Sequence, residues 1–490
     1  MQSNIFNSLG AKAVIISILA LILLVPLLFV QNLVSERQER YREAIIEVSS
    51  KWGSAQEIAG PMLVVPYMDD VTTTSYGPAG EQINTTRRIE RNAYFLPESL
   101  NYQTEVVSET KKRGIFDIAV YSLNMDVEGT FLRPDFSALD IPSNDLLLDR
   151  AYVVVGLSDT RGIKEEIKLK WGDVEVDFLP GTNGVVFPNT YESYASLNNY
   201  VDDSFMGREM SASAVANTAI KYDPSQSIVG VYAPVNISGA AAEIPFSFNT
   251  TLLGTNKLNF YPLGKTTNAE VSSSWTNPSF DGNILPEASD NDESFENGFV
   301  ANWKTSYFSR GVAQSFVGNQ GELAQQIGQI QQKKFGVTFK IPVDFYQKTE
   351  RAVKYGILFI GLTFLVFFSF EFLGTNRRRI HALQYIFIGL AMSIFYLLLL
   401  SFSEYLGFNI SYVVSAALTI GLITWYANYI LRNQKSTTLV ALILFLVYLY
   451  LFTILQLQDY ALILGSVATF ATLATLMYLT RKIDWSNATQ

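Results

Sequence analysis

The sequence predicts an α+β membrane protein with one N-terminal transmembrane helix, a large β-rich outer domain and a C-terminal bundle of five transmembrane helices. Three observations support this fold class. Long apolar segments lie at both ends of the chain, strand-like runs lie between them, and basic residues occupy alternate connections within the last 140 residues. The strand-like runs favour an antiparallel sandwich, in one lobe or two.

The five C-terminal apolar segments also predict a topology. Each is about the 20 residues that cross a bilayer core. Basic residues follow the first, third and fifth segments, whereas the other two connections carry only Glu404 and Asp459. By the positive-inside rule the basic connections and the C-terminus are cytoplasmic, so the chain before residue 355 is on the outer side. The segments are 355–372, 382–402, 410–431, 437–457 and 460–480.

The apolar segment 13–30 is either an uncleaved anchor or a signal peptide. Its 18 residues exceed the usual apolar length of a cleaved signal, and the residues after it offer no small-x-small cleavage site. An anchor with a cytoplasmic N-terminus delivers the following chain to the outer side, in agreement with the C-terminal topology. We therefore predict an anchor at 1–34, an outer domain at 35–350 and a membrane domain at 351–490.

The outer domain is predicted to begin with a helix and continue in strands. Ser35 and Gln38 form a capping-box pattern that starts a helix, although one uninterrupted helix over 13–52 is an alternative. Residues 172–173 indicate a hairpin turn, and 321–333 show a helical apolar stripe of Leu323, Ile327 and Ile330. The expected strands are 62–66, 92–96, 115–123, 152–157, 167–179, 244–253 and 268–275.

Composition excludes several classes of partner and chemistry. Residues 35–350 hold 41 of the 45 acidic residues and 26 of the 36 basic ones, a net charge near −15. This charge disfavours nucleic acid and anionic lipid headgroups as broad partners. The chain has no cysteine, so disulfides, thiolate nucleophiles and Cys-ligated zinc are excluded. No cofactor is predicted.

The common catalytic signatures are incomplete. His381 is the only histidine and is predicted on the cytoplasmic side, so neither a paired-histidine metal site nor an outer Ser-His-Asp triad can form. Residues 263–266 resemble the end of a phosphate-binding loop, but Asn259 stands where the leading glycine is required. The acidic run 290–293 lacks the glycine of a calcium loop, because Phe295 occupies that position.

Ionisable residues at the predicted membrane boundaries are the sharper functional candidates. Glu371, Glu404 and Asp459 are placed to act as general acids or proton carriers, or simply as interfacial anchors with a basic partner. Their position near the interfaces, away from the middle of the membrane, favours anchoring. His381 is expected to be an interfacial polar residue. A basic cluster is first a topology determinant and second a site for anionic lipid headgroups: Arg377, Arg378 and Arg379.

A group of aromatic residues in the outer domain has two interpretations. Trp275, Phe280, Phe299 and Trp303 either form an aromatic binding surface or fill the core of the sandwich. The core is the ordinary place for such side chains, so we expect most of them to be buried.

Many ordered stretches of the chain resemble the CreD family, inner-membrane proteins of Gram-negative bacteria associated with cell envelope integrity. They include Pro342-Val343-Asp344-Phe345-Tyr346-Gln347, Phe370-Glu371, Gln384-Tyr385, Ser403-Glu404, Thr480-Arg481, Leu96-Pro97-Glu98-Ser99-Leu100, Arg161-Gly162-Ile163 and Ser274-Trp275. The chain departs from the family pattern at Ala382 and Thr276, where a proline is usual, and at Tyr405, where a histidine is usual.

The resemblance implies an inner-membrane location, so the topology predicted from the charges makes residues 35–350 periplasmic, with both termini cytoplasmic. It implies a role in envelope integrity or the response to envelope stress, but no reaction, catalytic residue or cofactor. The leading hypothesis is a non-enzymatic protein whose periplasmic domain binds an envelope protein or lipid ligand. A transporter or lipid-handling protein is the alternative, and an enzyme acting on cell-wall or lipid material is a third. The oligomeric state is left open.

Overall fold

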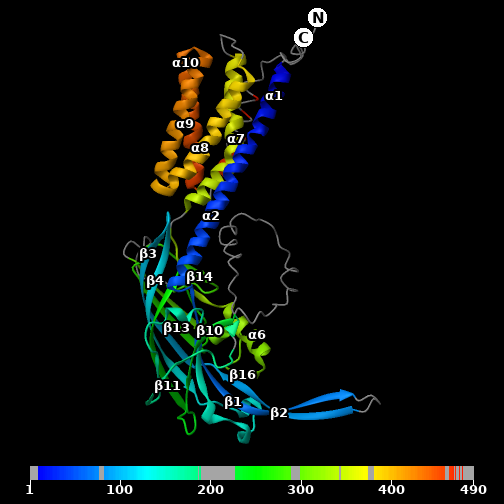
Figure 1. Cartoon of the computed structure of the whole chain (residues 1–490), viewed down its shortest axis with the longest axis vertical. Helices are drawn as coiled ribbons and strands as arrows, with labels where there is room; N and C mark the ends of the chain where they lie inside the picture. Colours follow the sequence, from blue (N-terminus) through cyan, green and yellow to red (C-terminus); the bar gives the residue numbers. More distant parts are fainter. Residues whose placement is uncertain are drawn as a thin grey trace. The chain divides into compact units, whose positions relative to one another are not determined.

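The chain folds into two compact units, each described here by itself (Figure 1). The computed structural model describes residues 9–76, 82–185, 187–188, 227–287, 298–341, 344–373 and 380–457, with isolated positions over 463–477. One unit joins Met1–Arg42 to Pro342–Gln490, and the other is Glu43–Ile341. The predicted fold class is confirmed: apolar helices come from both ends of the chain, and the middle is rich in strands.

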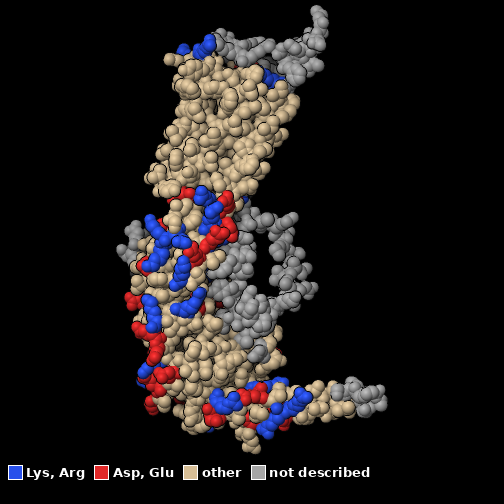
Figure 2. Space-filling model, viewed as in Figure 1, with Lys and Arg blue, Asp and Glu red and all other residues tan. Residues whose placement is uncertain are grey.

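The first unit is a helical bundle. Five helices of the described chain are long and apolar enough to cross a membrane. Figure 2 shows charged side chains at the two ends of this bundle and a broad uncharged band between them. Residues 460–480 lie largely outside the described residues, so the last predicted span stays a prediction. The first of the five combines α1 (Leu9–Ile22) and α2 (Leu24–Trp52), and the others are α7 (Asp344–Leu373), α8 (Ala382–Leu406), α9 (Phe408–Leu431) and α10 (Gln434–Gln456).

The N-terminal helix continues well beyond the apolar segment. Only a turn at Leu23 separates α1 from α2, and Pro26 explains it, because proline has no N–H to donate to the carbonyl of Ile22. Ser35 is an interior residue whose Oγ donates to the carbonyl of Gln31 at 3.2 Å. The predicted capping box is therefore wrong, and the alternative of one helical segment as far as Trp52 is confirmed.

The second unit is a sandwich of two mixed sheets. A ten-stranded sheet has the order β14-β17-β12-β1-β5-β10-β8, with β2, β9 and β16 at its sides, and a seven-stranded sheet has the order β15-β13-β3-β4-β11-β6-β7. Most pairs are antiparallel, but β1 pairs with β12, and β13 with β3, in parallel. The prediction of a sandwich is confirmed, whereas a purely antiparallel one is wrong, because distant segments of the chain return beside β1 and β3.

The strands and small helices of this unit have the following bounds. The larger sheet contains β1 (Gln56–Tyr76), β2 (Gln82–Phe95), β5 (Tyr152–Leu157), β8 (Leu179–Pro180), β9 (Phe187–Pro188), β10 (Ser227–Pro234), β12 (Lys257–Phe260), β14 (Pro278–Gly282), β16 (Ser315–Gly318) and β17 (Phe335–Phe339). The smaller sheet contains β3 (Ser99–Arg113), β4 (Phe116–Leu132), β6 (Lys168–Trp171), β7 (Val174–Asp177), β11 (Glu243–Thr255), β13 (Thr266–Ser273) and β15 (Phe299–Ser306). The helical elements are η2 (Ser137–Leu139), η3 (Ser143–Asp145), η4 (Leu148–Arg150), η5 (Thr160–Gly162), α5 (Tyr307–Arg310) and α6 (Gln320–Gln331).

One hydrophobic core lies between the sheets. Alternate residues of β15 are buried, as a strand with one face on a core requires. Aromatic rings meet across the two sheets: Tyr102 of β3 lies 4.9 Å from Phe260 of β12, and Tyr121 of β4 lies 5.1 Å from Phe339 of β17, measured between ring centroids. These contacts join both sheets in a single cluster of buried side chains.

Two local predictions in the sandwich are confirmed. β6 and β7 form the expected hairpin, with Gly172 at a positive φ of 58° that glycine adopts without strain. Helix α6 buries Leu323, Ile327 and Ile330 completely. Asn319 caps this helix in a capping box with Glu322, which ends the apolar stripe on its N-terminal side.

Candidate functional site

Glu371 forms a buried ion pair with the N-terminal helix. Its carboxylate, near the end of α7, contacts Lys12 Nζ of α1, and the exposed fractions of the two side chains are 4% and 21%. Neither the second oxygen, Oε2, nor the buried hydroxyl of Tyr385 on α8 completes a well-formed hydrogen bond with the described residues, but the two groups lie close enough to interact with each other. The site is thus a buried carboxylate that is paired with Lys12 through one oxygen and has a buried tyrosine hydroxyl beside it.

Glu404 lies in a second pair with the same N-terminal segment. Its side chain, on α8, is 7% exposed, and Oε1 is 3.6 Å from Nε of Arg37 on α2. The Tyr346 hydroxyl of α7 donates to the same oxygen at 3.2 Å. Tyr405, which stands where a histidine is usual, is 74% exposed and has no place in this cluster. The cluster joins α2, α7 and α8 around one buried carboxylate.

These two pairs hold the N-terminal helix against the bundle at two levels. A buried ion pair contributes little net stability, but removal of its basic member would leave a carboxylate that is only 4% or 7% exposed without its partner, which is destabilising. The arrangement therefore makes the position of α1 and α2 depend on Glu371 and Glu404. Both ion pairs directly support an anchoring role for these carboxylates.

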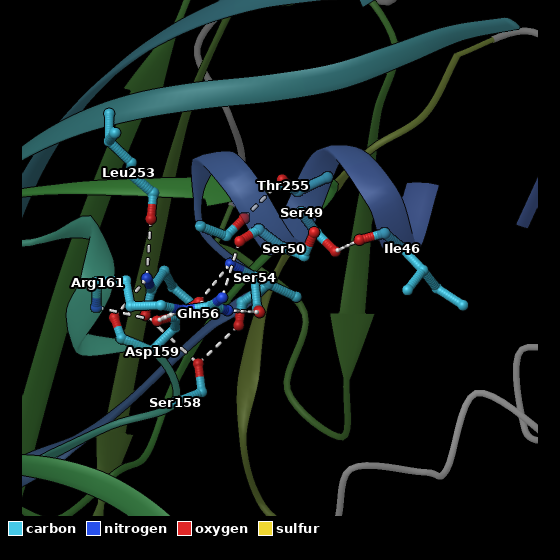
Figure 3. Close-up of polar contacts among 12 residues, drawn as sticks. Ile46, Ser49, Ser50, Ser54, Gln56, Ser158, Asp159, Arg161, Leu253 and Thr255 are labelled. Carbon is cyan, nitrogen blue, oxygen red and sulfur yellow. Dashed lines mark hydrogen bonds and ion pairs between the residues drawn. The ribbon is translucent and has the colours of Figure 1, made fainter. Parts of the chain in front are cut away.

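A polar cluster surrounds the C-terminal end of α2 in the sandwich unit (Figure 3). The Asp159 carboxylate accepts hydrogen bonds from Ser54 N at 2.9 Å and from Arg161 N at 3.0 Å. The guanidinium of Arg161 pairs with the same carboxylate, at 2.9 Å from Nε and 2.6 Å from Nη2. Its Nη1 donates to the carbonyl of Ser50 at 2.8 Å, so Arg161 satisfies a carbonyl in the last turn of the helix.

The residues after the helix are held equally tightly. Gln56 Nε2 donates to the carbonyls of Asp159, at 3.0 Å, and Leu253, at 2.8 Å. Thr255 Oγ1 donates to the carbonyl of Gly53 at 2.7 Å. A Cβ at Gly53 would stand 2.6 Å from the Leu253 carbonyl oxygen, so only glycine allows this approach. The cluster is a structural clamp with its polar atoms engaged by the protein itself.

The pKa of Asp159 reflects this setting. Burial acts to raise the pKa of the carboxyl, but hydrogen bonds from Arg161 and Ser54 outweigh it and hold the pKa below its usual value. The carboxylate is therefore charged at neutral pH and keeps its hydrogen bonds to the helix end.

The structure places the other predicted residues of the membrane unit as follows. His381 is exposed and caps α8: its Nδ1 accepts from Leu383 N at 3.3 Å, and its own N donates to Gln384 Oε1 at 2.9 Å. These two hydrogen bonds form a capping box at the start of α8 and account for His381 as a helix cap. Arg377, Arg378, Arg379 and Asp459 lie outside the described residues.

The predicted aromatic group lies in and beside the core of the sandwich. Phe299 is 5% exposed and Trp303 2%. The ring of Phe280, half-buried, is 5.7 Å from Phe299 and 5.8 Å from Trp303. Trp275 is half-buried and donates from Nε1 to the carbonyl of Lys340 at 3.1 Å. The four residues therefore pack into the core more than they present an open face.

The suspected phosphate and calcium motifs gain no support. Lys265 pairs with Glu98 at 2.6 Å, in a turn between β12 and β13. The acidic run 290–293 lies outside the described residues. Within the part of the chain that the structure describes, no group of three or more His, Cys, Asp or Glu is arranged to hold a metal ion.

Sequence reasoning missed the basic partners of the carboxylates. A signal existed for Lys12, because the predicted topology puts Lys12 and Glu371 on the same side of the membrane. A signal existed for Arg37 too, because Arg37 and Glu404 each follow an apolar segment that ends on the predicted outer side. The pairing of Asp159 with Arg161 is local, but no local signal identifies the contact of Asp159 with Ser54 or those of Gln56, because these partners lie 103 to 197 residues away along the chain.

Comparison with known proteins gives matches over nearly the whole chain. The family model described as "Inner membrane protein CreD" matches residues 8–486. The inner membrane protein CreD of Escherichia coli (strain K12) is 27% identical over 465 residues, which cover 95% of this chain and 91% of that protein. The matched region includes both ends of the membrane unit and the sandwich between them.

Proposed function

Because the chain belongs to the CreD family of inner membrane proteins, we propose that it is a non-enzymatic protein that supports envelope integrity or the response to envelope stress. In this proposal the membrane unit is an anchoring platform. The sandwich is periplasmic and binds an envelope component or partner protein, and both termini are cytoplasmic. The envelope role is proposed from the family resemblance. The separate roles of the membrane unit and the sandwich are proposed from the contacts within each unit.

The pairing of both buried carboxylates with the N-terminal helix is the observation that carries this proposal. Glu371 contacts Lys12, and Glu404 contacts Arg37, so each carboxylate is committed to a basic residue on the helix that leads to the sandwich. A carboxylate that carries protons or a cation must exchange its partner during each cycle. A carboxylate committed to a fixed helix instead supports an anchor.

The clamp at Asp159 and Arg161 supports the same division. It ties the last turn of α2 to loops and strands of the sandwich, through Ser50, Ser54 and Gln56. One helical segment thus has specific polar attachments in each unit. This is the arrangement expected where a membrane helix holds an outer domain.

One observation favours the alternative of a transporter or lipid-handling protein. Oε2 of Glu371 and the Tyr385 hydroxyl are buried beside each other, and neither completes a well-formed hydrogen bond with the described residues. Such orphaned atoms are suited to a passing proton or a bound water. The alternative therefore makes Glu371 the essential residue of a transport cycle.

Neutralising both carboxylates separates the two functions. Glu371→Gln combined with Glu404→Gln leaves Lys12, which is 21% exposed, and Arg37, which is 38% exposed, without their acidic partners. An anchor therefore predicts lower membrane abundance and a proportional loss of survival under envelope stress. Each variant is expressed in cells that lack the chromosomal gene for this protein. Survival under envelope stress is measured, and the abundance of the variant in the membrane fraction is measured by immunoblot. Loss of survival at unchanged abundance would support transport and contradict the anchor.

Glu350→Gln is the matched control for this experiment. Glu350 lies on the same helix, α7, and pairs with Lys354 at 2.9 Å one turn away, with 25% of its side chain exposed. A half-exposed pair of this kind contributes at most about 1 kcal/mol. This variant should keep both abundance and survival.

A further inference from the structure

Strands β1 and β2 continue past the sandwich as a two-stranded ribbon (Figure 1). Their pairing runs without interruption from Leu63 opposite Phe95 to Tyr76 opposite Gln82. On the other edges, β5 pairs with β1 only as far as Val64, and β16 pairs with β2 only from Asn92. Over 84–91, the described strands therefore pair with β2 from the β1 side alone.

The base of the ribbon is fixed by ion pairs. Asp69 and Arg91 are 3.0 Å apart, Glu90 and Arg150 are 2.7 Å apart, and Arg88 contacts Asp145. Arg150 and Asp145 belong to the short helices η4 and η3 beside the sheet. Two of these contacts join the base of the ribbon to η3 and η4.

A two-stranded ribbon with an open edge favours a further strand. Isolated two-stranded ribbons are marginally stable in water, and an open edge of unpaired N–H and C=O groups is a template for another chain. Two isoleucines on β2 also expose their side chains, Ile83 by 45% and Ile89 by 39%. Both lie on one face of the ribbon, because six residues separate them.

We propose that β2 pairs antiparallel with β2 of a second copy of this chain, about a two-fold axis at Thr86. In this register Ile83 lies opposite Ile89 of the second copy, and Ile89 lies opposite Ile83. Gln82 lies opposite Glu90, and Asn84 opposite Arg88. Apolar residues therefore meet apolar ones, and no two like charges are opposed. The pairing is self-complementary, as a two-fold interface requires.

Neighbouring registers of the same parity lack this match. An axis at Arg87 places the two Arg87 side chains opposite each other, and an axis at Thr85 places Ile83 opposite Arg87. Like charges that are directly opposed destabilise a strand pair, and an isoleucine opposite an arginine loses its apolar contact. The side chains of β2 thus favour an axis at Thr86 over the two adjacent registers for pairing with a second copy.

The absence of cysteine from the chain makes a direct test available. In Thr86→Cys the two thiols face each other across the axis, at a Cα separation of about 5 Å that a disulfide accepts. Mild oxidation of native membranes should convert most of the protein to a covalent dimer. Thr86 is exposed, so the substitution leaves the core intact. Adding Ile89→Asp should lower the dimer fraction several-fold, because the charge then opposes Ile83.

Thr72→Cys is the matched control. Thr72 lies opposite Thr86 on β1 and is equally exposed, with the two hydroxyls 2.9 Å apart. In the proposed dimer the two Thr72 positions are three strand spacings apart, about 14 Å, beyond the reach of a disulfide. Three results would each overturn the proposal. Both variants could crosslink equally, Thr86→Cys could form no dimer at normal abundance, or Thr86→Cys could form a disulfide with a different protein.

Discussion

At Asp159 a single carboxylate links the end of a helix to a strand loop. It accepts backbone hydrogen bonds from Ser54 and Arg161 and pairs with the Arg161 guanidinium, which in turn reaches the carbonyl of Ser50. Burial and these hydrogen bonds act on its pKa in opposite directions, and the hydrogen bonds prevail. The residue therefore stabilises the fold more in its charged form than in its neutral form.

The lowered pKa predicts acid sensitivity. A carboxyl whose pKa is lower in the folded state stabilises the fold above its unfolded pKa, about 4, and this contribution is lost as the pH falls through the folded value. We expect the unfolding temperature of the purified full-length protein to fall below about pH 4, and Asp159→Asn to reduce that dependence while lowering stability at neutral pH. Asp173→Asn, in the exposed β6–β7 turn, is the control. An unchanged pH dependence in Asp159→Asn would contradict this role.

At the scale of elements, the N-terminal helix is the clearest case of competing local signals. Ser35 and Gln38 form a capping pattern, yet the apolar segment before them and the helical spacing after them are continuous, and the helix runs through. A capping pattern needs a chain that enters from outside the helix. Here the preceding residues are already helical, so the Ser35 hydroxyl bonds back to Gln31.

Substitution of Ser35 tests this assignment. Loss of an N-cap costs about 1 kcal/mol, whereas alanine inside a helix is favoured over serine by about 0.5 kcal/mol. Ser35→Ala should therefore leave the unfolding temperature in detergent unchanged or slightly raised, and Ser35→Pro should lower it, at a cost of about 3 kcal/mol or more. A fall of several degrees in Ser35→Ala would show that the residue is a cap after all.

The strands show how far local patterns reach. Alternation predicts parts of β4, β11 and β13, because each of these strands buries one face over part of its length. β5 is instead recognised as a continuous apolar run, since all of its residues are buried, and the β6–β7 hairpin by the turn at 172–173. The parallel pairs of β1 with β12 and of β3 with β13 join residues more than 160 positions apart, which no local pattern encodes. The ribbon formed by β1 and β2 was also out of reach, since its polar, threonine-rich residues lack a buried face.

At the scale of the molecule, apolar length and charge account for the membrane unit, while its internal contacts required the structure. Long apolar segments predict the spans directly, and their ends place Glu371 and Glu404 near interfaces. Both carboxylates pair with basic residues of the N-terminal helix because of the way the helices pack. This packing cannot be inferred from a single sequence. Likewise, only the structure of the sandwich shows that Phe299 and Trp303 are buried in its core.

The proposed topology predicts a labelling pattern. In this chain without cysteine, a membrane-impermeant maleimide should label Thr74→Cys, on the ribbon, in intact cells with a permeable outer membrane. Lys435→Cys, exposed at the start of α10, should be labelled only after the inner membrane is broken. The opposite pattern would reverse the predicted orientation.

The most direct test of the anchoring account replaces a whole ion pair. Lys12→Met combined with Glu371→Met removes the carboxylate that a transport cycle requires but leaves no unpaired charge, and buried pairs often tolerate such apolar replacement. Membrane abundance and survival under envelope stress are measured against each single variant. The account predicts that the double variant keeps both, while Glu371→Met alone loses abundance. Normal abundance of the double variant with lost survival would contradict it.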